Sequence, residues 1–253
     1  MFFGFDLGSR FVKIVYGSDF EKIRYEKIDT IQFYAKYCHK KSGKLILDFE
    51  KLSKRFKKID RAFACGYGKH IADLKNVETI TELEAHVIGA CHMVKIKDFT
   101  LLDLGGQDTK VVQVKNGNMF DFIMNERCAA GSGRYLENMC RILNIKVANF
   151  GNYYRNPVEL SNTCAIYGES EVISKIVEGL SSERIASGVN YSIFSRIAPE
   201  LKQSRSKKVV FVGGLAYNRA IKYFIKSRLK KEVYVPKHAE FNGAFGCWLK
   251  ARR

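Results

Sequence analysis

The chain of 253 residues is 46% hydrophobic and 27% charged, a composition typical of a globular protein that buries a core in one or two domains. No apolar run reaches the ~18 residues that a membrane-spanning helix needs, so we expect a cytoplasmic protein with no membrane partner. The seven cysteines are an odd number without a Cys-x-x-Cys pair, which argues against a disulfide framework.

The net charge of +17 raises the question of a nucleic-acid partner. The basic excess lies at the two ends of the chain, in residues 1–61 and 161–253, whereas residues 62–160 are balanced. Much of it falls on expected helix faces such as Lys51–Lys58, where solvated lysines are the usual explanation. The sequence contains neither a zinc-finger spacing nor an RNA-binding motif, so we expect no nucleic-acid partner.

The first elements follow from local patterns. An apolar run reaches Asp6, Gly8 and Ser9 form a turn, and a β-prone run leaves from Phe11, which predicts a β-hairpin. The sequence then predicts one or two further strands, a basic amphipathic helix and a buried strand, at residues 22–34, 48–57 and 61–65.

A helix is expected from Thr81 to about residue 94, because Thr81 and Glu84 form a capping-box pattern. Glu82 and His86 are four residues apart on one face of this helix. They could approach a phosphate site, but an ion pair or a capped surface face is the simpler interpretation.

The sequence of the first hairpin is repeated 97 residues later. Residues 5–13 align without a gap with residues 102–110, and Asp, Leu, Gly and Lys recur at matching positions. A repeat at this period indicates two lobes that begin with the same strand, glycine turn and strand. Backbone N–H groups in such a turn can bind phosphate, and an aspartate at the strand end can hold a hydrated metal ion. The two turns therefore predict a clamp for a nucleotide and its magnesium ion.

The second lobe continues with a strand at residues 119–124 and three helices at about 129–143, 168–179 and 183–203. A polar loop at residues 150–162 separates the first two of these helices. In the third helix isoleucine, valine and leucine recur every four residues as a core-facing stripe, although Pro199 could kink or end the helix early. A buried strand at 208–212 runs into Gly213–Asn218, a shape that holds a nucleotide's sugar or base against the backbone. A strand at 232–235 and a helix from Gly243 close the chain.

Cys128 and Cys164 each stand just before an expected helix, with glycines nearby. A helix N-terminus lowers a thiol's pKa and stabilises a bound anion. Two such thiolates suit a metal–sulfur cluster, yet a cubane cluster needs four ligands, which a two-fold dimer would supply. Two buried structural cysteines are the alternative.

Together these motifs resemble the activators (component A, or archerases) of 2-hydroxyacyl-CoA dehydratases, which share a family with the ATPase subunits of benzoyl-CoA reductase. The resemblance covers nearly the whole chain, and its most specific segments are 103–110, 124–134, 164–174, 213–218 and 242–244. It implies an α/β, actin-like or sugar-kinase-like ATPase fold of two ribonuclease-H-like lobes with a nucleotide cleft between them. The expected lobes are 1–98 and 99–253, with the C-terminal helix able to pack across.

The resemblance also implies a homodimer that shares one 4Fe-4S cluster, held by Cys128 and Cys164 of each subunit. ATP or ADP and Mg²⁺ are the other expected cofactors, with Asp6 and Asp103 holding magnesium through water and Gln107 positioning the attacking water. The expected cofactor-binding residues lie in the two phosphate loops and near the adenosine: Gly8, Ser9, Arg10, Phe11, Val12, Lys13, Gly105, Gly106, Gln107, Glu137, Gly213, Gly214, Tyr217 and Glu240.

The implied function is ATP-dependent, one-electron reduction of a partner iron–sulfur dehydratase, with reduced ferredoxin or flavodoxin as the electron source. Alternatives are a reductase of a double-cubane cluster protein or a benzoyl-CoA-reductase-like component, a small-molecule kinase of the same superfamily, and a non-hydrolysing binding module. The last is motivated by a departure in the first phosphate loop. The family pattern Gly-Ser-Thr-x-Ser-Lys reads Gly8-Ser9-Arg10-Phe11-Val12-Lys13 here, so two hydroxyls are lost and an arginine is gained.

Three further departures lie in the nucleotide-binding residues. The position of Glu137 is usually Asp in the family, and Tyr217 and Glu240 stand where relatives often place glutamine.

Overall fold

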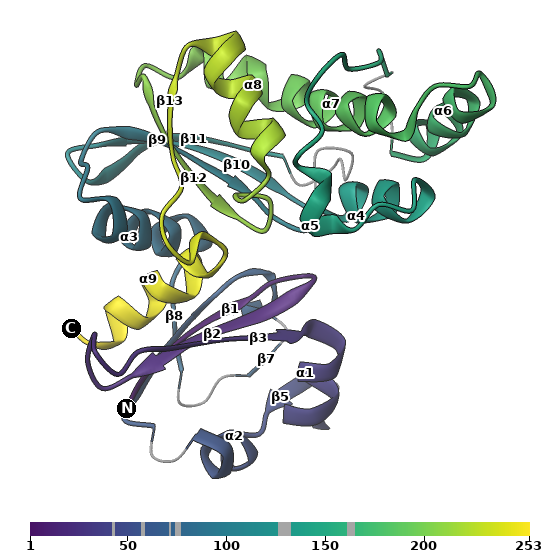
Figure 1. The fold of residues 1–253 in the computed structure, drawn as a ribbon. Helices are drawn as coiled ribbons and strands as arrows, with labels where there is room; N and C mark the ends of the chain where they lie inside the picture. The colour runs from purple at the N-terminus through teal and green to yellow at the C-terminus, as the bar shows by residue number, and fades with distance from the viewer. Residues whose placement is uncertain (42–43, 57–58, 71, 74–76, 126–132, 161–164) are drawn as a thin grey trace. The chain divides into compact units, whose positions relative to one another are not determined.

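The computed structural model describes residues 1–253 except 42–43, 57–58, 71, 74–76, 126–132 and 161–164 (Figure 1). The chain forms two compact units, Met1–Lys95 with Glu240–Arg253, and Ile96–Ala239. The last helix of the chain belongs to the first unit. That helix packs directly on the first strand, where Gly4 lacks the Cβ that would collide with the backbone of Ala244 and Trp248.

The first unit is built on a five-stranded sheet in the order β3-β2-β1-β6-β8. Its strands are β1 (Phe2–Leu7), β2 (Phe11–Gly17), β3 (Arg24–Asp29), β6 (Arg61–Cys65) and β8 (Glu78–Thr79). The first three are antiparallel neighbours, whereas β6 and β8 run parallel to β1. A small second sheet has the order β4-β5-β7, from β4 (Cys38–Lys41), β5 (Lys44–Leu47) and β7 (Ala72–Asp73).

Helices cover both faces of the first sheet (Figure 1). On one face Phe3 and Phe5 pack with Phe33 of α1 (Thr30–Tyr37) and Leu52 of α2 (Phe49–Phe56). On the other face lie α3 (Glu82–Val94) and α9 (Asn242–Ala251), with Trp248 at the centre of a buried cluster. Because side chains alternate along a strand, Asp6 faces α9, opposite to Phe5 and Leu7. The short 3₁₀ helices are η1 (Tyr67–His70) and η3 (Ala239–Phe241).

The second unit repeats the same topology with the order β11-β10-β9-β12-β13. Its strands are β9 (Phe99–Leu104), β10 (Thr109–Lys115), β11 (Asn118–Asn125), β12 (Lys208–Gly213) and β13 (Glu232–Tyr234). Here too the first three strands are antiparallel and the last two run parallel to the first. The internal repeat expected from the sequence is therefore present in both connectivity and strand direction.

The helices of the second unit are α4 (Gly133–Ile142), α5 (Val147–Phe150), α6 (Ala165–Val177), α7 (Ser182–Gln203) and α8 (Arg219–Leu229). The predicted stripe of α7 is fully buried with Leu102, Phe211 and residues of α4 and α8. Pro199 does not end α7, which continues to Gln203. Among the described residues no helix is both long enough and apolar enough to cross a membrane.

The prediction of strand structure through residue 34 was wrong, because α1 begins at Thr30. Asp29 caps this helix, and its carboxylate accepts hydrogen bonds from the N–H groups of Ile31 and Gln32. The aromatic and β-branched residues of the segment suggested a strand, but the cap and the burial of Phe33 and Tyr37 favour a helix.

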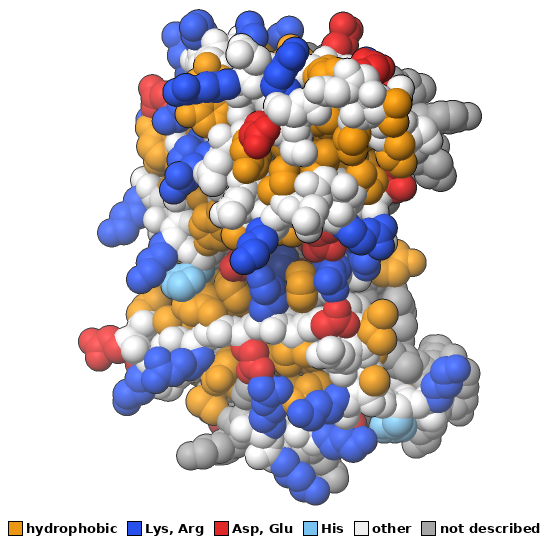
Figure 2. Space-filling model, turned by 45° about the vertical axis from the view of Figure 1, so that its right-hand side comes forward, with side chains coloured by type: hydrophobic (Ala, Val, Ile, Leu, Met, Phe, Trp, Pro, Cys, Tyr) orange, Lys and Arg blue, Asp and Glu red, His pale blue; other side chains and the backbone are white. Residues whose placement is uncertain are grey.

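On the face shown in Figure 2, lysine and arginine side chains are interspersed with acidic and hydrophobic ones. The exposed hydrophobic side chains include five on β11, the edge strand of the second sheet: Met119, Phe120, Phe122, Ile123 and Met124.

Candidate active site

The turn between β1 and β2 begins beside a buried ion pair. Asp6 and Lys13 face each other in the β1–β2 ladder, and Lys13 Nζ lies 3.2 Å from Asp6 Oδ2. Asp6 is only 3% exposed, so its charge depends on this lysine for compensation. Gly8 permits the tight turn, because a Cβ there would lie 2.8 Å from the carbonyl oxygen of Phe11. Val12 packs in the core, so only its backbone is available to a ligand at this turn.

Arg10, the residue that departs from the family pattern, is bound within its own unit. Its Nη1 lies 2.5 Å from Asp29 Oδ2, on the carboxylate that caps α1. The backbone N–H of Gln32, together with Arg10, lowers the pKa of Asp29. The guanidinium also lies 4.5 Å from the ring centre of Phe11. Arg10 is thus held against α1, and its main chain accepts a hydrogen bond from Thr30 N.

Around the same turn, the Thr30 hydroxyl donates to the Gly8 carbonyl at 2.8 Å, which fixes the turn against α1. Phe11 is another predicted cofactor-binding residue, and Lys27 lies over its ring with Nζ 5.0 Å from the ring centre. The same ammonium is 2.6 Å from Glu240 Oε2, so Glu240 forms an ion pair within the first unit.

The turn between β9 and β10 repeats this arrangement. Asp103 and Lys110 are ladder partners, and Lys110 Nζ lies 3.4 Å from Asp103 Oδ2 and 2.5 Å from Asp108 Oδ2. Asp103 and Lys110 are 3% and 1% exposed, so two carboxylates share one almost fully buried ammonium. Gln107 stands exposed within the turn, where it can reach a ligand. The turn is closed by a hydrogen bond from Gly105 N to the Asp108 carbonyl.

The start of α4 lies directly on this second turn. Gly133 N donates to the Gly105 carbonyl and Arg134 N to the Gly106 carbonyl, each at 3.0 Å. These bonds use N–H groups that the first turn of a helix leaves without intrahelical partners. Glu137 follows one turn later and is half-buried. The predicted ligands Cys128 and Cys164 lie outside the described residues, which resume at Gly133 and Ala165.

The segment after β12 adjoins the same turn. Gly213 has φ +89° and pairs with Leu104, and an added Cβ would collide with the Asp103 carboxylate. Gly214 leaves open space, because no atom lies within 4 Å of a Cβ built there. Tyr217 is 54% exposed, and its hydroxyl accepts a hydrogen bond from Ala239 N at 3.0 Å. Gly213 and Gly214 are therefore brought to the end of β9 at which Asp103 stands.

The structure thus forms two groups of predicted site residues. The first unit holds Asp6, the first phosphate loop and Glu240, whereas the second holds Asp103, the second loop, Glu137, Gly213, Gly214 and Tyr217. Sequence reasoning missed Asp29 and Asp108 as partners of Arg10 and Lys110. The Asp108 contact could have been found, since Asp108 and Lys110 are two residues apart in the repeated motif.

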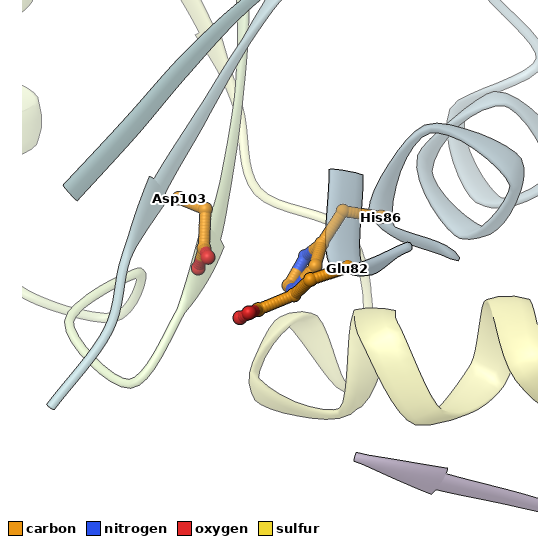
Figure 3. Close-up of side chains that lie close together, drawn as sticks. All are labelled: Glu82, His86 and Asp103. Carbon is orange, nitrogen blue, oxygen red and sulfur yellow. The ribbon is translucent and has the colours of Figure 1, made fainter. Parts of the chain in front are cut away.

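Two further side chains, Glu82 and His86, project from neighbouring turns of α3 (Figure 3). His86 is 3% exposed, so the interpretation of this helix face as surface is wrong for His86. Its Nε2 lies 3.9 Å from Glu82 Oε1, which agrees with the expected pairing of the two residues. Thr81 caps α3 as predicted, accepting a hydrogen bond from Glu84 N.

Comparison with known proteins identifies the family. The model of the BadF/BadG/BcrA/BcrD ATPase family matches residues 47–251. The chain belongs to this family.

Relatives of the family agree with the expected actin-like ATPase fold and with the resemblance. The chain is 37% identical over 201 residues to the (R)-2-hydroxyglutaryl-CoA dehydratase activating ATPase of Acidaminococcus fermentans, covering 77% of each chain. It is 33% identical to an uncharacterised protein of Methanocaldococcus jannaschii, over 98% of this chain and 100% of the other. The solved activator of 2-hydroxyisocaproyl-CoA dehydratase from Clostridium difficile, with bound ADPNP, superposes with a TM-score of 0.83 at 30% identity, covering 99% and 93% of the two chains.

Proposed function

We propose that this ATPase is the activator of an iron–sulfur 2-hydroxyacyl-CoA dehydratase or of a related reductase component. It hydrolyses ATP and passes single electrons through a 4Fe-4S cluster that two identical subunits share. Reduced ferredoxin or flavodoxin is the proposed electron source. The similarity to named activator ATPases over three quarters of the chain or more carries this proposal.

The repeated ion pairs support a role in nucleotide hydrolysis. Carboxylate oxygens are the ligands that Mg²⁺ prefers, often through retained water molecules. Asp6 and Asp103 each present a buried carboxylate at the end of a strand, beside a glycine turn with backbone N–H groups. In the proposed site both hold the hydrated magnesium, Lys13 adds positive charge toward phosphate, and Gln107 orients the attacking water.

The ion pair of Arg10 favours hydrolysis over a degenerate binding module. An arginine in a phosphate loop could occupy the phosphate position or replace a lost hydroxyl. Here Asp29 holds the guanidinium at 2.5 Å on the N-terminus of α1, within the same unit. The arginine therefore has a structural partner, and the turn keeps the Gly8 backbone and Lys13 for phosphate.

The remaining cysteines support Cys128 and Cys164 as the cluster ligands, because cluster ligation requires thiolates. Cys38, Cys65, Cys140 and Cys247 are buried, and Cys91 is half-buried. Burial raises the pKa of Cys38 to about 11 and of Cys140 to about 12. A hydrogen bond with Cys247, together with burial, raises the pKa of Cys65. The raised pKa values keep the thiols of Cys38, Cys65 and Cys140 protonated and disfavour them as ligands, which favours the two cysteines that precede α4 and α6.

The test is anaerobic purification followed by iron analysis, sedimentation and ATPase assays with and without candidate dehydratases. We expect four iron atoms per two chains, a homodimer, and Mg²⁺-dependent ATP hydrolysis. Cys128→Ser should lose the iron, whereas Cys140→Ser should retain it as the matched control. A monomer that binds a full cluster, or iron retained in Cys128→Ser, would contradict the shared cluster.

Asp103→Asn tests the magnesium role separately. The amide keeps the shape of the side chain but removes the charge, so ATP hydrolysis should fall by roughly a hundredfold or more while the fold persists. Asp121→Asn, on an exposed strand of the same sheet, is the control and should keep the wild-type rate. Wild-type turnover in Asp103→Asn would show that this carboxylate does not hold the metal.

A further inference from the structure

His86 is a buried imidazole whose hydrogen-bonding state can be worked out from its neighbours. It stands on α3 with 3% of its surface exposed, and α9 begins beside it at Asn242. A neutral imidazole has one nitrogen that donates and one that accepts, and the partner of one nitrogen decides the role of the other.

Asn242 determines which nitrogen of His86 carries the proton. The Asn242 Nδ2 lies 2.8 Å from the backbone carbonyl of His86 and 3.2 Å from the His86 Nδ1. A carbonyl oxygen can only accept, so the amide must present its NH₂ group to this side; the reverse orientation would set two oxygens against each other. The NH₂ group therefore donates to Nδ1, and the imidazole proton is on Nε2.

Two carboxylates lie near the protonated Nε2. Glu82 Oε1 lies 3.9 Å from it, and Gly243 separates it from Asp6. A Cβ on Gly243 would lie 2.9 Å from His86 Nε2 and 3.4 Å from Asp6 Oδ2. The glycine thus leaves space between the imidazole and the carboxylate at the start of α9, where a side chain would contact both.

We propose that His86 is a positioning residue of the hydrolytic site, and this inference rests on the proposed ATP hydrolysis. As an Nε2–H donor it orients the Asp6 carboxylate through one bridging water, so that Asp6 presents a fixed oxygen to hydrated magnesium. Asp6 Oδ2 is already bonded by Lys13 at 3.2 Å. Asn242 acts one step further away by fixing the tautomer of His86. Gly243 leaves the space between His86 and Asp6 free of a side chain.

The tautomer itself can be measured without activity. Long-range proton–nitrogen NMR spectra of the full chain, assigned by the signals that disappear in His86→Gln, should show an unprotonated Nδ1 and a protonated Nε2 for His86. Asn242→Ala should weaken this preference and give a mixture of tautomers. A protonated Nδ1 in the wild-type chain would overturn the inference.

Kinetics test the positioning role. His86→Leu should lower the kcat for ATP hydrolysis by about tenfold and raise the Mg²⁺ concentration for half-maximal rate, with a smaller change in the KM for ATP. His86→Gln retains an amide N–H donor near the position of Nε2 and should recover most of the rate. His92→Gln is the matched control, because His92 is exposed on the same helix and stacks on Phe20.

The outcomes separate the two proposals. Wild-type kcat and Mg²⁺ dependence in His86→Leu, or a folded His86→Gln no better than His86→Leu, would overturn the positioning role alone. A wild-type chain that does not hydrolyse ATP would overturn the proposed function together with this role, whatever tautomer the spectra show.

Discussion

Lys110 reaches across the β9–β10 ladder and places its ammonium nitrogen 3.4 Å from the carboxylate of Asp103. The same relationship joins Lys13 to Asp6 in the first unit, at 3.2 Å. In each case a lysine seven residues after the aspartate returns beside it, because the intervening turn folds the second strand back on the first. The two units therefore share a charged pair at the strand end, as well as their topology.

Lys110 is predicted to stabilise the second unit strongly. Lys110→Met should lower the free energy of unfolding by roughly 3–5 kcal/mol, because it removes the buried ammonium that lies beside the carboxylates of Asp103 and Asp108. The comparison is Lys175→Met, which breaks a surface ion pair between Lys175 of α6 and Glu178, the residue directly after that helix. This variant should lose less than about 1 kcal/mol of unfolding free energy. Urea unfolding of both variants measures the difference. Equal losses would show that the buried pair contributes no more than a surface pair.

Arg10→Thr restores the hydroxyl of the family pattern and is predicted to keep or increase ATP hydrolysis. Asp29 still caps α1 through its bonds to two backbone N–H groups, so the fold should persist. Lys13→Met is the contrasting variant and should lose most activity, since Lys13 compensates Asp6. Steady-state ATPase rates of both variants and the wild type at saturating Mg²⁺ test this prediction. A large loss in Arg10→Thr would show that the guanidinium has become a phosphate ligand.

Ionisation of the buried Cys140 thiol is predicted to lower the free energy of unfolding at alkaline pH. Burial, with the charge of Glu137, raises the pKa of its thiol from 9.0 to about 12. Between these values the folded chain binds more protons than the unfolded chain, so the free energy of unfolding decreases as pH rises above 9. One proton can contribute at most about 1.4 kcal/mol per pH unit. Urea unfolding at several pH values from 8 to 11 should give a smaller slope for Cys140→Ala than for the wild type; equal slopes would contradict the assignment.

The sequence predicted the parts of this site that depend on local spacing. Asp, Gly and Lys recur at fixed intervals in both hairpins, and a short turn brings such residues together whatever the rest of the fold does. Arg10 was different, because its partner Asp29 lies at the end of a third strand and is fixed only once α1 forms. The environment of His86 was also hidden, since its neighbours Asn242 and Gly243 come from the opposite end of the chain.

Gly213 is predicted to keep the Asp103 side chain in its position. Its φ of +89° disfavours any side chain, and a Cβ would also lie 2.9 Å from the Leu104 carbonyl carbon and against the Asp103 carboxylate. Gly213→Ala should therefore destabilise the second unit by more than the roughly 1–2 kcal/mol of left-handed strain, and should reduce ATP hydrolysis by moving Asp103. Gly117→Ala is the control, because Gly117 has φ +77° but nothing lies within 4 Å of its added Cβ. Thermal unfolding and ATPase rates of the two variants separate strain from collision. If both lose the same stability and neither loses activity, Gly213 serves only the turn and does not position Asp103.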